Sequence, residues 1–552
     1  MRTIGLFLIC LASAAAQTIP VTITVDAARP LGELKPIWRM FGADEPNYAT
    51  MKDGKKLLSE LGEMRPEDIY FRAHNLLCTG DGTPALKWGS TGIYTEDKDG
   101  KPIYNWTIVD RIFDTYRERH LHPYLQIGFM PEALSTHPEP YQHEWRPGAG
   151  YGRIATGWAY PPKDYAKFAE LVYQWVKHNV ERYGRAEVER WYFEVWNESN
   201  INSYWHGTPE ELYKLHDYAV DAVRRALPAA RVGGPDMAGT GGAFMQNFMK
   251  HVVSGTNYAT GKTGTPTDFL SFHAKGAPTF TEGHVRLGIA NQLRTVDQGF
   301  AMIAAVPELK NKPIVIGESD PDGCAACQGP QLGYRNTTMY SSYTAATFAR
   351  EHEIAARRGV NLDAALTWAF EFEDQPFFAG QRTLANNGID LPVMNVFRMF
   401  AKMSGQRLET KSSEEVPMED IVANGVRGKP DISAIASLSQ RKLTVFAWYY
   451  HDDDLPGPDA DIQLTVNHLP VTSGEVRLTQ YRIDKTHSNS FTVWQNMGSP
   501  TAPTDAQYAQ LVKAGQLDTD SHAPQTVSVK GGTAAVKLAL PRQGVTLLSM
   551  EW

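Results

Sequence analysis

Residues 191–200 read WYFEVWNESN. The stretch begins with a mostly apolar, strand-like run, 191–195, and then changes to the polar pair Asn197 and Glu198. An apolar strand that ends in polar side chains is typical of parallel β/α folds, because ligands bind at the carboxyl ends of their strands. We therefore expect Glu198 to lie at the ligand-binding edge of such a fold.

The same pattern continues on both sides of this stretch. From about residue 41 to residue 403, short apolar runs alternate with helical stretches, of which 164–183 carries apolar residues at helical spacing. Strands and helices that alternate over so long a segment favour a closed (β/α)8 TIM barrel over an open sheet. The expected strands include 69–71, 124–127, 191–195, 269–272, 314–316 and 364–368.

The pattern changes after about residue 405. Runs with strand-like alternation, such as 443–449, dominate the rest of the chain, and Gly531-Gly532 marks a hairpin. This predicts an antiparallel β-sandwich, to which the early run 21–25 adds a strand. The expected organisation is a signal segment at 1–16, a strand segment at 17–40, a barrel domain at 41–404 and the β-sandwich domain at 405–552.

The first 16 residues resemble a secretory signal peptide. Arg2 supplies a positive start, residues 4–12 form an apolar run too short to cross a bilayer, and residues 14–16 are a small-residue cleavage site. We expect an exported protein, periplasmic or extracellular. No later run reaches 18 consecutive apolar residues, so the sequence predicts no membrane insertion.

The composition excludes some classes of protein. The 552 residues carry 54 Lys and Arg against 62 Asp and Glu, a net charge of −8. A general nucleic-acid-binding protein needs a basic face, so we predict no nucleic-acid partner. With 42% hydrophobic and 21% charged residues, the chain has the composition of a folded protein. The oligomeric state stays open.

Three cysteines remain beyond the signal segment: Cys78, Cys324 and Cys327. In an oxidising compartment we expect one disulfide and one free thiol. The disulfide either joins the loops that carry Cys78 and the other two, or closes the short Cys324–Cys327 ring. We predict no metal site, because the sequence has neither a second cysteine pair nor a His-Glu-x-x-His motif.

A second acidic position repeats the arrangement at Glu198. Glu318, within Gly317-Glu318-Ser319-Asp320, directly follows the expected strand 314–316. Two glutamates at strand ends of one barrel would supply the paired carboxylates that glycoside hydrolysis requires. The alternative is that Glu198 caps a helix and Glu318 is an ordinary loop carboxylate, because barrel loops carry many acidic residues.

Several motifs together resemble glycoside hydrolase family 39 of clan A. WYFEVWNESN is similar to the family's Asn-Glu-Pro signature, with Ser199 in place of the usual proline. The resemblance covers essentially the whole chain beyond the signal segment. Its other motifs are FMPEAL at 129–134, VGGP at 232–235, YRID at 481–484, HSN at 487–489 and MGSP at 497–500.

The resemblance implies roles for the candidate residues. The family contains β-D-xylosidases and α-L-iduronidases, both retaining, with Glu198 matching the general acid/base and Glu318 the nucleophile. Glu198 must then carry a proton for the leaving alcohol, and Glu318 must be ionised, at a separation of about 5–5.5 Å. Asn197 is expected to bond the sugar 2-OH, unless it is a turn residue. No metal or organic cofactor is implied.

Other residues are candidates for substrate binding: His74, His273, Trp368, Glu371 and Glu373. Residues 72–74 resemble the family's Arg-x-His, and His273 resembles a sugar-contacting histidine, although a histidine after a strand is often structural. Trp368 is either a stacking floor under the sugar or barrel core. The alternation in residues 370–373 does not say which glutamate binds ring hydroxyls.

The sequence is ambiguous about the terminal sugar. Lys275 and Arg382 resemble the iduronidase branch, in which the matching cations hold the substrate carboxylate. Alternatively, Lys275 pairs with an internal acid, either Asp320 or a glutamate at 371 or 373. Residues 129–134 and the run 317–335 resemble bacterial β-xylosidases more closely.

We therefore expect a secreted retaining exo-glycosidase that acts on terminal β-D-xylosyl residues of carbohydrate chains. An α-L-iduronidase-like uronidase is the first alternative, and an α-L-arabinoside-cleaving enzyme is the second. A non-catalytic sugar-binding barrel is the alternative from another class, and the retention of both Glu198 and Glu318 argues against it. Long loops at 90–105 and 135–157 are expected to shape the pocket and limit it to chain ends.

Overall fold

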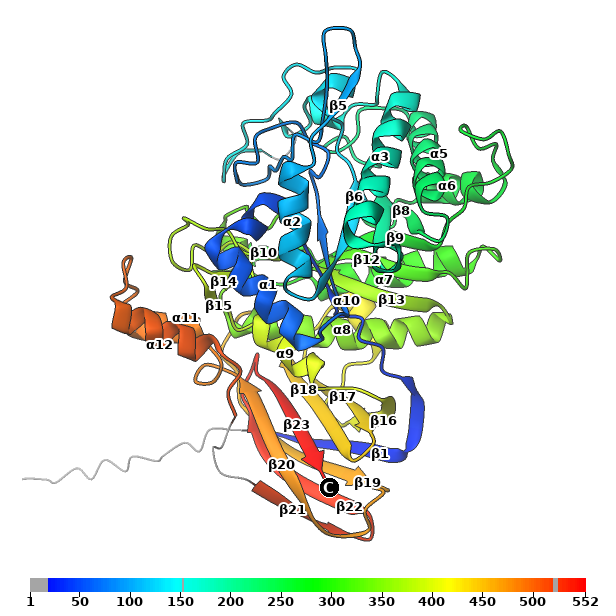
Figure 1. Ribbon diagram of the computed structural model, residues 1–552. Coiled ribbons are helices and arrows are strands. Elements are labelled where there is room, and N and C mark those ends of the chain that lie inside the picture. Colours follow the sequence, from blue (N-terminus) through cyan, green and yellow to red (C-terminus); the bar gives the residue numbers. More distant parts are fainter. Residues whose placement is uncertain (1–17, 151–152, 520–524) are drawn as a thin grey trace, which may run out of the picture.

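The computed structural model describes residues 18–150, 153–519 and 525–552. The predicted signal segment lies outside the described residues. A barrel domain occupies the upper part of Figure 1, and a sheet domain lies below it.

Eight parallel strands in the described residues close the larger domain into a barrel (Figure 1). They follow one another around the ring in chain order, and the pairing of the last strand with the first closes it. The predicted TIM barrel is confirmed. Its strands are β2 (Met40–Ala43), β3 (Ile69–Ala73), β6 (Leu121–Ile127), β7 (Tyr192–Val195), β8 (Arg231–Met237), β9 (Phe269–Lys275), β12 (Pro313–Asp320) and β13 (Asn361–Thr367).

Helices cover the outside of this barrel (Figure 1). Local sequence explains where they begin: Asp164 accepts from the first N–H groups of α3, and Thr208 and Glu211 form a capping box on α5, which starts with Pro209. They are α1 (Lys52–Met64), α2 (Thr107–Arg117), α3 (Tyr165–Tyr183), α4 (Arg185–Val188), α5 (Pro209–Ala226), α6 (Ala243–Ser254), α7 (Ile289–Ala304), α8 (Thr338–Arg358) and α9 (Met394–Ala401).

Strand β7 shows how the barrel divides its side chains. Phe193 and Val195 belong to the large core that includes the helices, whereas Tyr192 belongs to the small core inside the barrel. Glu194 alternates with them and bonds Arg72 across the interior. Toward the carboxyl end of β7, the inward side chains therefore change from apolar to charged. The inner apolar core consists of Met40, Tyr70, Tyr124, Tyr192, Phe269, Val315, Ala364, Leu366 and Trp368.

The second domain is the predicted accessory β-domain. Its strands form one sheet that closes on itself around a separate hydrophobic core, antiparallel except where β1 runs parallel to β19. The early run 21–25 lies in β1 and buries Val21, Ile23 and Val25 in this core. In ring order the strands are β1 (Ile19–Glu33), β16 (Gln406–Ser412), β17 (Asp431–Ser439), β18 (Lys442–Tyr450), β23 (Val545–Glu551), β20 (Ser473–Ile483), β21 (Gln525–Lys530), β22 (Thr533–Leu540) and β19 (Ala460–Asn467).

Small elements decorate both domains. Helices α11 and α12 project from the sheet domain toward the barrel hairpin of β14 and β15 (Figure 1), where Tyr508 bonds the carbonyl of Asn387 at 2.9 Å. These elements are β4 (Tyr94–Glu96), β5 (Pro102–Tyr104), β10 (Thr279–Thr281), β11 (His284–Arg286), β14 (Ala385–Asn386), β15 (Ile389–Asp390), α10 (Met418–Asn424), α11 (Ser490–Asn496) and α12 (Asp505–Gly515).

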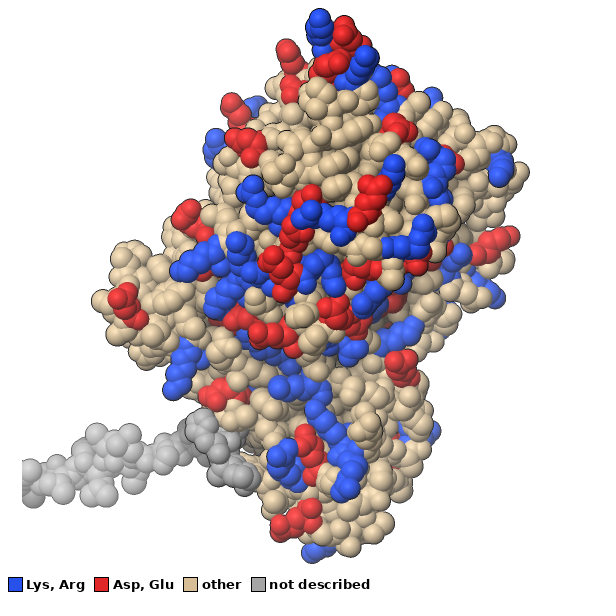
Figure 2. All heavy atoms as spheres, in the orientation of Figure 1, with Lys and Arg blue, Asp and Glu red and all other residues tan. Residues whose placement is uncertain are grey.

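Two surface properties bear on partners. Among the described helices, none combines the length and the apolar character that crossing a membrane requires. On the face shown in Figure 2, Lys and Arg are interspersed with Asp and Glu and do not gather into one basic area.

Candidate active site

Glu198 and Glu318 meet at the carboxyl ends of the barrel strands. Glu198 follows β7 by three residues, and Glu318 lies near the end of β12. A single nitrogen, Nδ1 of His273 on β9, lies 2.7 Å from Oε1 of Glu198 and 3.7 Å from Oε2 of Glu318. Their side chains are 16% and 7% exposed. Two partly accessible carboxylates thus face one another in an otherwise buried polar site.

Glu318 is surrounded by cations. Nζ of Lys275 lies 2.6 Å from its Oε2, and Nη1 of Arg72 lies 3.7 Å from its Oε1. Burial acts to raise the pKa of Glu318, but His273 and Lys275 outweigh it and lower the pKa to about 2. Glu318 is therefore a carboxylate at any pH near neutrality.

His273 is held as a cation between carboxylates. Its Nε2 lies 2.7 Å from Oδ2 of Asp236, opposite the contact to Glu198. Burial acts to lower the pKa of His273, yet Asp236, Glu318 and Glu198 raise it to about 10. Both ring nitrogens then carry protons, so the ring donates to Glu198 and to Asp236.

Arg72 fixes the orientation of Asn197. Its fully buried guanidinium donates to Oε2 of Glu194 at 2.6 Å and to Oδ1 of Asn197 at 3.0 Å. The amide Nδ2 of Asn197 is buried and has no partner among the described residues. Because the amide oxygen is used by Arg72, Asn197 presents a free N–H donor next to Glu198.

His74 and Trp368 form a buried wall of the site. Nδ1 of His74 lies 2.8 Å from Oδ1 of Asp44, and its Nε2 lies 3.8 Å from Glu318. The ring of Trp368 lies 4.3 Å from the ring of His74 and 5.0 Å from the guanidinium carbon of Arg72. Only 4% of Trp368 is exposed, and it belongs to the inner barrel core. The structure thus favours the core alternative for Trp368 over an open stacking floor.

The two candidate carboxylate-binding cations are already paired. Nζ of Lys275 contacts Oδ2 of Asp320 at 2.6 Å in addition to Glu318. Arg382 is fully buried, with Nη1 2.7 Å from Oδ1 of Asp320 and Nε 3.4 Å from Oδ1 of Asp322. The internal partner of Lys275 is therefore Asp320, one of the acids that the sequence suggested.

Glu371 and Glu373 lie apart from this cluster. Oε1 of Glu373 accepts the N–H of Asp53 at 2.7 Å at the start of α1, and Oε1 of Glu371 accepts the N–H of Gly388 at 2.6 Å. Burial raises the pKa of Glu371 to about 8. The structure places both glutamates in hydrogen bonds to backbone N–H groups, and the expectation that one of them binds ring hydroxyls stays a prediction.

Most of the chain matches a known family. The family model described as glycosyl hydrolases family 39 covers residues 21–533. The chain belongs to glycosyl hydrolase family 39. This family 39 chain is 26% identical over 504 residues to a β-xylosidase of Geobacillus stearothermophilus, across 87% of this chain and 86% of that protein. It is 24% identical over 568 residues to an α-L-iduronidase of Homo sapiens, across 94% and 77%.

Solved structures agree on the fold. A monomeric β-xylosidase from Caulobacter crescentus CB15 matches with a TM-score of 0.75 at 21% identity, covering 96% of this chain and 99% of that one. Family membership makes the protein a glycoside hydrolase that acts on carbohydrate, and it confirms the family resemblance seen in the motifs.

Sequence reasoning did not single out two buried acids of the family 39 site, Glu194 and Asp236. Both contact Arg72, and Asp236 also contacts His273. Each carried a detectable signal. Asp236 directly follows the motif at 232–235, in the same strand-end position as Glu198, and Glu194 is a charge inside an apolar strand.

The loop after β12 is closed by a disulfide. Cys324 and Cys327 are bonded, and Cys78 is a buried free thiol. Arg335 clamps the ring by donating to the carbonyls of Cys324 and Cys327, at 2.6 Å each. Of the two pairings that the sequence left open, the structure shows the short ring.

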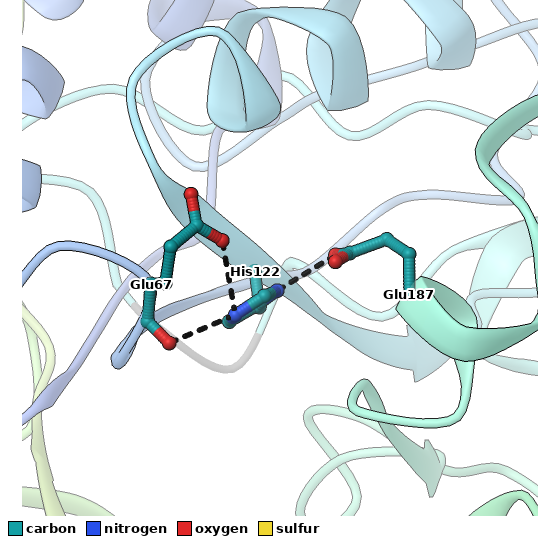
Figure 3. Close-up of side chains that lie close together, drawn as sticks. All are labelled: Glu67, His122 and Glu187. Carbon is teal, nitrogen blue, oxygen red and sulfur yellow. Dashed lines mark hydrogen bonds and ion pairs between the residues drawn. The ribbon is translucent and has the colours of Figure 1, made fainter.

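One cluster elsewhere has the residue types of a metal site. Glu67, His122 and Glu187 converge at the opposite end of the barrel, near the amino ends of β3, β6 and β7 (Figure 3). Arg117 lies among them, with Nη2 2.8 Å from Glu67 and Nε 3.0 Å from Glu187. Because the guanidinium already forms ion pairs with both carboxylates, we assign this cluster as an ion-pair network between neighbouring strands.

Proposed function

We propose that this family 39 hydrolase is a secreted, retaining exo-glycosidase that removes terminal β-D-xylosyl residues from xylo-oligosaccharides or related glycans. The observation that carries the proposal is the placement of Glu198 and Glu318 on either side of His273 Nδ1. In the first step Glu318 attacks the anomeric carbon while Glu198 gives its proton to the leaving oxygen. In the second step Glu198 takes a proton from water, which displaces Glu318.

The spacing supports retention of configuration. Two atoms that share a neighbour can be no farther apart than the sum of their distances to that neighbour. The contacts of His273 Nδ1, 2.7 Å and 3.7 Å, therefore keep the nearest carboxylate oxygens of Glu198 and Glu318 closer than about 6.5 Å, where the range for inverting enzymes begins. This bound is compatible with the separation of about 5–5.5 Å that retaining enzymes use.

The charge balance supports a neutral sugar. A uronide needs an uncompensated cation for its carboxylate, but Lys275 already contacts Glu318 and Asp320, and Arg382 already contacts Asp320. A second carboxylate beside Lys275 would be repelled by both acids. Xylose has only hydrogens at C5, so it requires no cation there.

The loops support attack at chain ends. The cavity beside His74 has a volume of about 10 Å³, and its walls include His143, Ile154 and Trp158 from the long loop after β6. That is room for about one water molecule. The described residues thus fill most of the space on this side of the site, which supports an enzyme that holds a terminal residue.

Export is part of the proposal. A disulfide on the barrel rim is stable in an oxidising compartment, which agrees with the signal-like sequence at residues 1–16. Amino-terminal sequencing of the protein secreted by a bacterial host should begin at Gln17. Retention of residues 1–16 on the mature protein would contradict export by cleavage.

An α-L-iduronide is the second candidate substrate, because Lys275 is still 16% exposed and lies next to Glu318. The deciding experiment is hydrolysis of matched aryl β-D-xyloside, α-L-iduronide and α-L-arabinopyranoside. We expect turnover of the xyloside and little of the other two. An iduronide preference that disappears in Lys275→Ala would overturn the choice of sugar.

A further inference from the structure

The two-carboxylate reaction leaves Asp236 without a role, although it is among the most constrained side chains of the site. It lies near the end of β8, is fully buried and has a left-handed φ of 52°. Its N–H donates to Oγ of Ser271 at 3.1 Å, and its carbonyl oxygen accepts the N–H of Glu198 at 2.8 Å. The backbone of Asp236 thus holds the backbone of Glu198 directly.

The side chain of Asp236 holds the partner of Glu198. Its Oδ2 accepts from Nε2 of His273 at 2.7 Å and from Nη2 of Arg72. Its Oδ1 has no hydrogen-bond partner among the described residues and faces Gly317, where an added Cβ would lie 2.0 Å from it. Gly317, which precedes the proposed nucleophile Glu318, therefore leaves the space that the carboxylate of Asp236 occupies.

We propose that Asp236 is a positioning residue that keeps His273 as an imidazolium against Glu198, while its backbone carbonyl fixes the loop that carries Glu198. The inference rests on the proposed function, in which Glu198 is the general acid. Asp236 is fully buried, and it acts through His273 and the Glu198 backbone.

The environment of His273 explains why an anion is needed at position 236. Burial alone would favour the neutral ring of His273. The charge of Asp236 keeps the ring cationic, and His273 then stabilises the carboxylate that forms on Glu198 after proton transfer. The charged and titratable groups that face the pair are Arg72, His74, Tyr124, Glu194, Glu198, Lys275 and Glu318.

The protonation states agree with this role. Burial acts to raise the pKa of Asp236, but Arg72 and His273 together lower it, so Asp236 is ionised. Asp236 is in turn the largest cause of the raised pKa of His273, against the effect of burial. Each partner stabilises the charged form of the other.

The test is the variant Asp236→Asn, which keeps the backbone contacts and removes the charge. On an aryl β-D-xyloside, the high-pH decline of kcat/KM should occur in this variant at a pH about one unit or more below that of the wild type. That is the size of shift expected for one close charge. Its kcat should fall by about 10²-fold for an alkyl leaving group, which needs the general acid, and far less for a dinitrophenyl group.

Glu194→Gln is the matched control. Glu194 is equally buried and contacts Arg72 as Asp236 does, but it bonds Tyr124 and Ser271 where Asp236 bonds His273. The high-pH decline of kcat/KM should shift clearly less in Glu194→Gln than in Asp236→Asn. Equal shifts in the two variants, or an Asp236→Asn loss that is the same for both leaving groups, would overturn the positioning role.

A second measurement does not depend on whether an Asp236 variant folds. Ring-nitrogen NMR of the wild-type protein, with the His273 signals identified by their loss in His273→Gln, should show a doubly protonated ring at pH 8. A neutral His273 at pH 7 would overturn the proposal. If the wild type cleaves no glycoside, the proposed function fails, and the NMR result still decides the state of His273.

Discussion

The ammonium of Lys275 lies 2.6 Å from the carboxylate of Glu318. The same ammonium lies 2.6 Å from Asp320 at the end of the same strand. Lys275 therefore pairs with the proposed nucleophile of this chain, whatever sugar the pocket accepts. A largely buried ion pair of this kind is costly to break from one side, because the remaining charge is left unpaired.

Removing Lys275 should shift the low-pH side (the acid limb) of the pH profile of kcat/KM. Lys275 is one of the cations that hold the pKa of Glu318 at about 2, against the effect of burial, so its loss raises that pKa. Glu318 must be ionised to attack, and we expect the acid limb of kcat/KM for Lys275→Ala to move to higher pH. Lys275→Arg keeps the charge and should leave the limb near the wild-type position. An unchanged acid limb in Lys275→Ala would show that the contact does not control the nucleophile.

Thiol chemistry should separate the three cysteines. Cys78 is fully buried, and burial raises the pKa of its thiol to about 12, so it should not react with an aromatic disulfide reagent in the native protein. Mild reduction should expose two reactive thiols, Cys324 and Cys327, and unfolding should add the third. One thiol that reacts rapidly without reduction, or three free thiols in non-reducing mass mapping, would contradict the pairing.

Glu373 should matter for stability and not for substrate binding. Its carboxylate accepts two N–H groups at the start of α1, from Asp53 and Gly54. Loss of such an interaction in Glu373→Ala should cost about 0.5–2 kcal/mol of unfolding free energy, measured with denaturant. Glu63→Ala, at an exposed position of the same helix, is the control and should change stability by less than about 0.5 kcal/mol. A large rise in KM for Glu373→Ala would contradict this prediction and indicate that Glu373 binds substrate.

Glu351 should make the protein less stable as pH rises. It is fully buried on α8, accepts from Oγ of Ser319 at 2.7 Å, and has a pKa that burial raises to about 8. Between its ordinary pKa near 4.5 and 8, the unfolded chain releases this proton while the folded chain retains it, so stability falls with pH over that range. Thermal unfolding of Glu351→Gln should therefore occur at a higher temperature than wild type at pH 8.5, with little difference at pH 4.5. The same difference at both pH values would contradict a titrating Glu351.

Much of this architecture could be predicted from local sequence. Strand β7 is recognisable because its apolar run stops at Asn197 and Glu198, and Glu318 repeats that pattern after β12. What local sequence does not contain is the set of contacts across the barrel. The pairing of Lys275 with Asp320, and of His273 with Asp236, depends on which strands are neighbours in the ring and on which side chains point inward.

Other contacts are equally hidden from local sequence. Glu371 and Glu373 follow strand β13 closely in sequence, and the structure places them against Gly388 and the start of α1. Helices α11 and α12 lie in a region that reads as strand-rich, and α12 is stabilised by a capping box at Thr504 and Gln507 that a search for strand alternation overlooks.

The central claim is that Glu318 forms a covalent bond to the sugar. The most direct measurement is intact-protein and peptide mass spectrometry after incubation with a 2-deoxy-2-fluoro-β-D-xyloside that carries a dinitrophenyl leaving group, because fluorine slows breakdown of the glycosyl-enzyme. We predict one added fluoroxylosyl group, located on Glu318, and none in Glu318→Gln. Turnover of the matching unfluorinated xyloside with the label on another residue, or with no label at all, would contradict the account.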